Sequence, residues 1–224
     1  PAQGGVIGTR MYMGNGVSIG TINREIDLAL QARYRSSISR EASLAIDQQF
    51  LVALETLQNE LGEGSLSSAI DSFFGSFSEL ANTPSDTALR TIALQQGEVL
   101  AARISELAAG YDGLASEITS GIENTVDAAN ELLEQIAVLN GQIGTYEGMG
   151  DEASELRDQR DLMVDQLSQL IDVTAVEAAG GMIELRVGSI PILVGDSSRG
   201  LQTHREIDAD GVVGLSVQVA QDGS

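Results

Sequence analysis

The sequence has no cysteine, no lysine, no tryptophan and a single histidine. Without cysteine there are no disulfide bonds, no thiol nucleophile and no cysteine-ligated metal site. The lone His204 cannot by itself supply a histidine metal cluster, and it would be the only histidine for a Ser-His-Asp triad, so we expect a surface position for it. Aromatic residues amount to 4% of the 224 residues, so we expect a core of aliphatic side chains.

Positive charge is also scarce. The 12 basic residues are all arginine and stand against 33 acidic residues, which gives a formal net charge of −21. Such a field repels nucleic-acid phosphates and anionic lipid, so neither nucleic-acid binding nor a membrane-surface role is expected. No apolar run approaches the ~18 residues of a membrane-spanning helix, so no membrane insertion is expected. With 42% apolar residues, the chain can nevertheless fold around a core.

Proline is rare, and none occurs between Asp86 and Tyr146. Through most of that stretch apolar residues recur at steps of three and four, which is a helical heptad seam with a four-residue stutter after Ile118. The seam residues are Ile104, Leu107, Tyr111, Leu114, Ile118, Ile122, Ala129, Leu132, Ile136, Leu139, Ile143 and Tyr146. At ~1.5 Å per residue the stretch would form a rod on the order of 90 Å long. The molecule is therefore expected to be elongated.

Two further helices are predicted before this rod. The first runs from about residue 22 to 61, where apolar residues recur every four positions and so wind slowly around the helix. A shorter helix over residues 66–80 holds three of the four phenylalanines. The break at Thr83-Pro84 separates it from the rod, for which Ser85 is the expected N-cap.

After the rod, a glycine turn leads to a helix over residues 152–171, with Asp151 as its expected cap. From Asp172 onward the apolar period changes to two, which is typical of strands. The alternating residues are Ile183, Leu185, Val187, Ile190, Ile192, Val194, Val213, Leu215, Val217 and Val219. Turns are expected at Gly180-Gly181, Gly188-Ser189 and Asp210-Gly211, which leaves room for four to six short strands.

These patterns predict a mainly α fold with an antiparallel β-subdomain (α+β), built on an elongated bundle of long helices. Residues 1–171 would be the helical bundle, opened by a short extended segment around a Gly14-Asn15-Gly16 turn. Residues 172–224 would be antiparallel strands that begin, or form part of, a second subdomain.

Two motifs come close to ligand sites without completing one. Gly14-x-Gly16-x-x-x-Gly20 is one residue off the dinucleotide-binding fingerprint and lacks a βαβ frame. Residues 208–211, Asp-Ala-Asp-Gly, resemble the start of a calcium loop, but Val219 stands where the bidentate glutamate is needed. We interpret both as turns. No catalytic, cofactor-binding or metal-binding residue is therefore predicted, and the chain is not expected to be an enzyme.

The segment Leu156–Asp161 carries the most informative charges. Arg157 and Asp161 lie one helical turn apart, and the simplest interpretation is an exposed i,i+4 pair worth ~0.2–0.5 kcal/mol. The sharper hypothesis concerns Arg160, which lies close to the apolar face and would reach a neighbouring helix or the base of the β-subdomain. The candidates for structural or interaction roles are Arg157, Asp158, Arg160 and Asp161 in this helix and Leu132, Ile136 and Leu139 in the rod.

Three segments resemble the flagellar hook-associated protein 1 family, in the order that the family has them. Met13–Asp27 begins Met-Gly-Asn-Gly-Val and looks like the opening of that family's helical D1 domain. Ile136–Ile143 reads Ile-Ala-x-Leu-Asn-x-x-Ile, as in the family's long helix. Leu156–Asp161, followed by Ile171-Asp172-Val173, is similar to its DQRD helix and the passage from helix to strand. Because family members carry terminal segments that build a D0 coiled coil, we expect this chain to be a fragment without them.

The resemblance implies a structural protein of the bacterial flagellum, at the junction between hook and filament. It implies export through the flagellar apparatus to the extracellular flagellum. The implied partners are neighbouring copies in a ring, hook protein, the second junction protein and an export chaperone, with no cofactor. Two alternatives stay open: another axial protein such as hook protein, the second junction protein or flagellin, and a non-flagellar surface binding module or helical enzyme.

Overall fold

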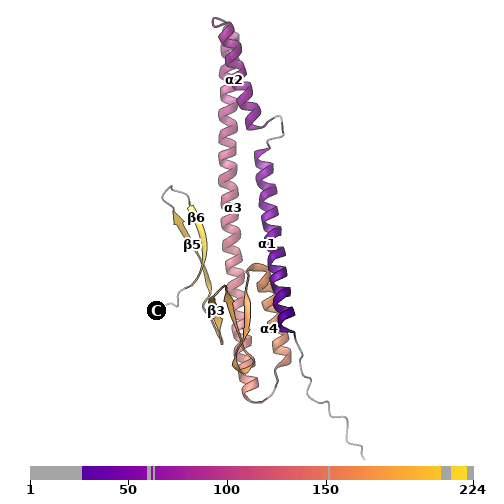
Figure 1. The fold of residues 1–224 in the computed structure, drawn as a ribbon. Helices are drawn as coiled ribbons and strands as arrows, with labels where there is room; N and C mark the ends of the chain where they lie inside the picture. The colour runs from indigo at the N-terminus through magenta and orange to yellow at the C-terminus, as the bar shows by residue number, and fades with distance from the viewer. Residues whose placement is uncertain (1–26, 60–61, 63, 151, 208–212, 221–224) are drawn as a thin grey trace, which may run out of the picture.

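The computed structural model describes residues 27–59, 62, 64–150, 152–207 and 213–220, and its shape is elongated (Figure 1). The 62-residue helix α3 (Thr87–Gly148) runs along the whole molecule. Helices α2 (Leu66–Asn82) and α1 (Leu28–Gln58) follow one another along it, and α4 (Ser154–Leu170) packs at its lower end. Two small antiparallel sheets lie on the side of α3 away from α1. The predicted rod and the mainly α fold with a β-subdomain are confirmed.

Helix α3 begins one residue later than the sequence suggested. Its N-cap is Asp86, not the expected Ser85. The backbone N–H groups of Ala88 and Leu89 donate to Asp86 Oδ1 at 2.8 and 3.3 Å. The turn after α2 decides this position, because the Asp86 N–H donates to Thr83 O and so closes the turn at Asp86. A carboxylate there also suits the positive end of the helix dipole.

The heptad seam of α3 is buried more continuously in its lower half than in its upper half. Ile136 and Ile143 are fully buried, whereas in the upper half Leu107 is 7% exposed but Ile104 and Tyr111 are 52% and 41% exposed. The expectation of one seam along the whole rod therefore holds only in part for the upper half, where α2 and the end of α1 cover only part of the helix. In the lower half α3 lies between α4 and the sheets, which requires a wider apolar face than a two-per-heptad seam. Leu133, outside the predicted seam, is consequently also fully buried.

Helix α1 begins after Asp27, whose carboxylate accepts hydrogen bonds from two backbone N–H groups of the first turn. It ends at Gln58, before the predicted end, with Asn59 in the left-handed conformation at φ 44° that asparagine tolerates. The predicted winding row is only partly buried, since Ile46 is 53% exposed. Residues 22–26 of the predicted helix lie outside the described residues.

Helices α2 and α4 lie close to their predicted positions. The Ser65 hydroxyl caps α2, whereas the N-cap position of α4 is Ala153, without a side-chain cap. The expected cap, Asp151, lies outside the described residues. The buried face of α4 is rotated from the predicted one, because the helix packs against both α3 and α1. Val164 is therefore fully buried, while Leu170 is 36% exposed.

The β-subdomain consists of antiparallel hairpins. One sheet contains, in order, β1 (Thr174–Glu177), β2 (Ile183–Val187), β3 (Ile190–Val194) and β4 (Ser197–Ser198), and a separate ribbon pairs β5 (Leu201–Ile207) with β6 (Val213–Val219). The described residues thus hold six strands, within the predicted four to six. The Gly188-Ser189 turn lies between β2 and β3, as predicted, with Gly188 at φ 59°. The predicted turns and motifs at residues 14–20 and 208–211 lie outside the described residues.

One hydrophobic core joins the helices to the sheet. Leu133 and Ile136 of α3 pack with Leu167 of α4 and with Leu185 and Leu193 of the sheet, and all five are fully buried. The lower end of α3 is therefore held between α4 and the strands. This arrangement brings polar residues of the three elements into contact at the edge of the core.

Candidate structural site at the junction of helices and sheet

A buried asparagine of α3 forms side-chain hydrogen bonds with the backbone of the sheet. Asn140 is fully buried, and its amide pairs with Ile183 at the start of β2 as a neighbouring strand would. The Ile183 N–H donates to Asn140 Oδ1 at 3.2 Å, and Asn140 Nδ2 donates to Ile183 O at 2.7 Å and to Gly195 O at 2.8 Å. Both amide hydrogens and the oxygen are thus used, as burial of a polar side chain requires.

Arg160 of α4 completes this contact. The residue is 4% exposed, and its Nη1 donates to Asn140 Oδ1 at 3.1 Å and to Gly181 O at 2.7 Å. The Asp161 carboxylate lies 3.9 Å from Arg160 Nε. Arg160 therefore contacts both a neighbouring helix and the base of the sheet, the two locations that the sequence analysis left open. A buried guanidinium is tolerated here because its hydrogen bonds to these partners are charge-assisted and the partners are held in fixed positions.

Arg157 does not form the i,i+4 pair with Asp161 that the spacing suggested. Its Nε and Nη2 instead donate to the two carboxylate oxygens of Glu147 in α3, each at 2.7 Å. These hydrogen bonds hold the pKa of Glu147 below its ordinary value, and Glu147 in turn raises the pKa of Arg157. The prediction is wrong because the planar guanidinium binds both oxygens of a carboxylate on the adjacent helix. Asp158, also a candidate, is exposed.

The turn between β1 and β2 fits against these side chains because it ends in glycine. Gly181 closes the 3-10 turn η1 (Ala179–Gly181) at φ 70°, a conformation that L side chains rarely adopt. A Cβ at this position would also collide with the Glu147 carboxylate and the Arg157 guanidinium. The backbone of the turn can therefore approach the ion pair only as glycine.

A second ionic cluster fixes α1 to α4. Arg35 is 5% exposed, with Nε 2.7 Å from Asp165 Oδ1 and Nη2 3.5 Å from Asp161 Oδ1. Among the residues of α1 (Leu28–Gln58), Arg35 alone is buried. Sequence reasoning missed Arg35, although one signal was present: an arginine on the same helix face as Ile38 and Ala42.

Farther up α3, Asn130 makes the same kind of contact with the ribbon. The Leu201 N–H donates to Asn130 Oδ1 at 2.7 Å, and Asn130 Nδ2 donates to Leu201 O at 2.9 Å. An exposed ion pair of 3.0 Å between Arg205 and Glu123 lies beyond it. Helix α3 thus binds each of the two sheets through one asparagine. Spacing along the chain does not identify the strand residue that each amide meets.

The remaining candidates fall into two groups. Ile136 and Leu139 are buried in the core and Leu132 is part-buried against it, whereas His204 is exposed on β5, as expected. Among the described residues there is no group of three or more His, Cys, Asp or Glu placed to hold a metal ion. Helices long and apolar enough to cross a membrane are likewise absent from that part of the chain. The polar residues of the site hold secondary-structure elements together.

We expect Arg160→Ala to lower the melting temperature by a few degrees. Asn140 Oδ1 and Gly181 O would each lose a charge-assisted hydrogen bond, with a loss of ~1–3 kcal/mol in a domain of this size. Arg186→Ala is the matched control, since that arginine is 43% exposed and pairs with Glu184 two residues away. Equal shifts for the two variants in thermal unfolding would contradict an anchoring role for Arg160.

We also expect a pH dependence from the pair of Arg157 and Glu147. Because the folded-state pKa of Glu147 is lowered, the pair contributes fully above the ordinary glutamate value of 4.5 and is lost as pH falls through the folded value. Between about pH 7 and about pH 3 the unmodified chain should therefore lose more stability than Glu147→Gln, which cannot titrate there. Urea unfolding at each pH measures this difference. If both proteins lost the same stability between the two pH values, the pair of Arg157 and Glu147 would not contribute to stability.

The fold and the site together define an elongated structural domain. A single long helix is braced by shorter helices and by two sheets, and buried polar side chains fix the elements against one another. The comparison with known proteins identifies the family. The family model described as the flagellar hook-associated protein FlgK helical domain matches residues 51–224, so the chain belongs to this family. The resemblance found in the sequence is confirmed.

Individual relatives agree with this assignment. Flagellar hook-associated protein 1 of Bacillus subtilis is 27% identical over 193 residues, which are 85% of this chain and 38% of that protein. The protein of the same name from Salmonella typhimurium is 27% identical over 194 residues, or 86% of this chain and 35% of its own length. The chain thus spans a little over a third of these relatives.

A solved structure matches in fold as well. It is the structure of the flagellar hook junction protein FlgK from Burkholderia pseudomallei, with a TM-score of 0.73 and 25% sequence identity. The match covers 86% of this chain and 34% of that one. Most of this chain is therefore similar to that protein in both sequence and fold.

Proposed function

We propose that the chain forms the elongated helical part of a structural protein at the junction between the flagellar hook and filament. The observation that carries the proposal is the family match over residues 51–224, in a domain whose axis is one 62-residue helix. The relatives are named flagellar hook-associated protein 1, and the similar solved structure is named a hook junction protein. These names support a role in assembly and not in catalysis.

In this proposal the partners are other flagellar proteins. They are neighbouring copies in a ring, hook protein and the second junction protein, with an export chaperone that binds elsewhere on the full protein. The protein would be exported unfolded and would act on the extracellular flagellum. A chain without cysteine suits that route, since no disulfide can trap it on the way. Contacts within and between neighbouring helices favour fast folding after release.

The site would make the lower half of the rod behave as one stiff body. Arg35 ties α1 to α4, Arg160 ties α4 to α3 and the sheet, and Asn140 ties α3 to the sheet. Buried polar contacts of this kind restrict the relative position of the elements more than apolar packing does. We propose further that residues 172–224 begin a second subdomain on the helical bundle of residues 1–171. Mechanical force on the bundle would pass to this subdomain through the hydrophobic core that the two share.

Deletion of the gene in its own bacterium tests this function. The cells should build hooks, lack attached filaments and release unassembled flagellin into the medium, as measured by electron microscopy and immunoblotting. A plasmid copy should restore filaments, and an Arg160→Ala copy should restore fewer. Cells without hooks would favour the alternative of hook protein. Cells that swim normally would overturn any role at the junction.

A further inference from the structure

The middle of α3 lies between two parts of the helix that are fixed by other elements. The upper fixed part is where α1 ends. Arg103 Nη2 donates to the carbonyl oxygens of Leu57 and Gln58 at 3.5 and 3.3 Å, and Gln58 Nε2 donates to Tyr111 Oη at 3.2 Å. The Leu57 side chain lies against Gly110, where a Cβ would collide with it. We call these contacts the α1 clasp, and they hold the end of α1 on α3.

The lower fixed part is the hydrophobic core and the ribbon. Val126 is the uppermost residue of α3 in the core, and Asn130 follows with its hydrogen bonds to the ribbon. The exposed ion pair of Glu123 and Arg205 lies just above them. Residues 112–121 therefore lie between the two fixed parts, and none of them is buried. We call this stretch of α3 the middle segment.

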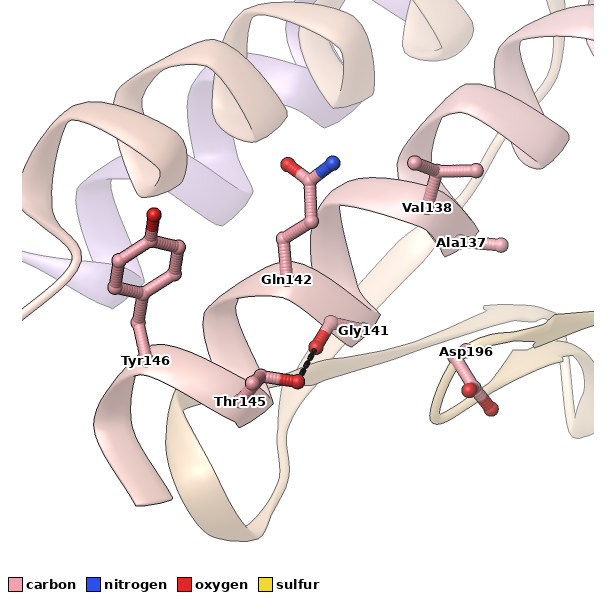
Figure 2. Close-up of a pocket in the computed structure, with 7 residues that line it drawn as sticks. All are labelled: Ala137, Val138, Gly141, Gln142, Thr145, Tyr146 and Asp196. Atoms are coloured by element: carbon pink, nitrogen blue, oxygen red, sulfur yellow. Dashed lines mark hydrogen bonds between the residues drawn. The ribbon is translucent and has the colours of Figure 1, made fainter. Parts of the chain in front are cut away.

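Two glycines of the middle segment have no packing reason among the described residues. At Gly113 and Gly121 an added Cβ would meet nothing within 4 Å. Gly141, in the lower half, is different, because a Cβ there would lie 3.2 Å from Asp196 Cβ on the turn beside α3 (Figure 2). Glycine inside a helix costs about 1 kcal/mol relative to alanine, so each open glycine weakens the middle segment.

Hydroxyl side chains weaken the same stretch further. The Ser116 hydroxyl donates to Asp112 O and the Thr119 hydroxyl to Ala115 O, each at 2.9 Å. Bonds of this kind, back to the carbonyl four residues earlier, slightly destabilise a helix and often bend it. They draw on backbone acceptors that the helix itself uses.

The order of residues in the middle segment also favours bending. Ser120-Gly121 is a pair of the type at which helices kink, and it follows directly on the stutter after Ile118. Residues 104–156 contain no basic residue, so no ion pair between successive turns can stabilise this part of α3.

We propose that the middle segment is a bending joint of the rod. The helix is continuous through it, so the joint bends without a break in the helix. Helix α1 runs beside the joint and acts as a strut, since Arg35 fixes it to α4 and the α1 clasp fixes its other end to α3 (Figure 1). Between these two attachments no residue of α1 is buried, so the strut limits bending without preventing it.

The joint divides the rod into two bodies. The upper part of α3 and α2 would change direction together, while the lower half keeps its shape through the contacts of Arg35, Asn140 and Arg160. The inference goes beyond the proposed function and does not depend on it, because bending is a property of the free protein. If the junction function holds, the joint lets the upper part adjust its direction while the lower half stays stiff.

Residual dipolar couplings of backbone N–H groups test the joint in the full-length protein, deuterated for NMR spectroscopy. The N–H bonds of an α-helix point along its axis, so a rigid α3 would show the same degree of alignment at both ends. We expect residues 87–107 to align more weakly than residues 126–148, because the upper part moves relative to the lower half. Equal alignment of the two ends in the unmodified protein would overturn the proposal, including the case in which another part of the protein braces the middle segment.

Substitutions in the joint should change this difference in both directions. Gly113→Ala with Gly121→Ala should bring the two degrees of alignment together, because both sites have room for a methyl group and alanine stabilises the helix. Gly75→Ala in α2 is the matched control, since that glycine has equally open space and lies outside the joint, and it should leave the difference unchanged. Arg103→Ala should increase the difference by releasing the strut.

Circular dichroism should show the same helix content in the alanine variants of Gly113, Gly121 and Gly75. If the double variant kept the full difference in alignment, the motion would arise outside the middle segment and the proposal would be wrong. None of these results depends on whether deletion of the gene releases flagellin, so the joint and the junction function are tested separately.

Discussion

Ile136→Asp should unfold much of the lower half of the molecule, whereas Ile104→Asp in the same helix should leave it folded. Ile136 is fully buried in the core between α4 and the sheet, so the new carboxylate would be placed among apolar side chains. We expect a loss of ~3–5 kcal/mol. Ile104 is 52% exposed, and its replacement should change stability by ~1 kcal/mol or less. Urea unfolding followed by circular dichroism measures both.

The two substitutions are matched in chemistry, in helix and in predicted seam. Their difference therefore reports burial in the tertiary structure and not helix propensity, which is the same for both changes. Glu134→Ala, at an exposed position two residues from Ile136, should be nearly silent. Similar unfolding midpoints for Ile136→Asp and Ile104→Asp would show that the core lies elsewhere.

Asn140→Ala should destabilise the protein more than Asn130→Ala. The first change leaves the Ile183 N–H and the carbonyls of Ile183 and Gly195 without their side-chain partner, inside the core. Since a buried unsatisfied group costs ~1–3 kcal/mol, we expect a loss of ~2–4 kcal/mol. Asn130 is only part-buried, so the backbone of Leu201 can gain water instead, and ~0.5–1.5 kcal/mol should be lost.

Hydrogen exchange gives a local measurement of each contact. The Ile183 amide should exchange much faster in Asn140→Ala, and the Leu201 amide should do so in Asn130→Ala. Asn140→Asp is a useful control, because a carboxylate keeps the acceptor for Arg160 but cannot donate to the two carbonyls. It should therefore also be destabilised. If the Ile183 amide exchanged at an unchanged rate in both Asn140→Ala and Asn140→Asp, the hydrogen bonds of Asn140 would not be what fixes the sheet to α3.

Several parts of the fold were predictable because they depend on the local chain. A stretch free of proline with apolar residues at steps of three and four can form a long helix whatever surrounds it, and α3 does. Alternation over Ile183–Val187 and Ile190–Val194, with a glycine between them, likewise predicts a hairpin, and β2 and β3 form it. The ends of elements were less accurate, as the shift of the cap from Ser85 to Asp86 illustrates, because a turn is closed by backbone hydrogen bonds that the residue types alone do not specify.

The site was predictable only in part. Arg160 was a candidate because an arginine beside an apolar helix face needs a partner, and that reasoning did not require the partner to be known. Arg157 was assigned to Asp161 because the two residues lie one helical turn apart, but the carboxylate that it binds is that of Glu147 in α3. Arg35 was missed for the same reason, since its aspartates come from a helix more than a hundred residues later.

The sequence by itself determined the elongated shape, the order of helices and strands, the absence of disulfide chemistry and the resemblance to the family. Each of these follows from composition or from spacing along one element. The tertiary structure decided which residues of the α3 seam are buried, which carboxylate each arginine meets and which strand residues the two asparagines bind. The physical reason is that burial and pairing depend on what lies across from a side chain, and the repeat of a single helix carries no information about its neighbours.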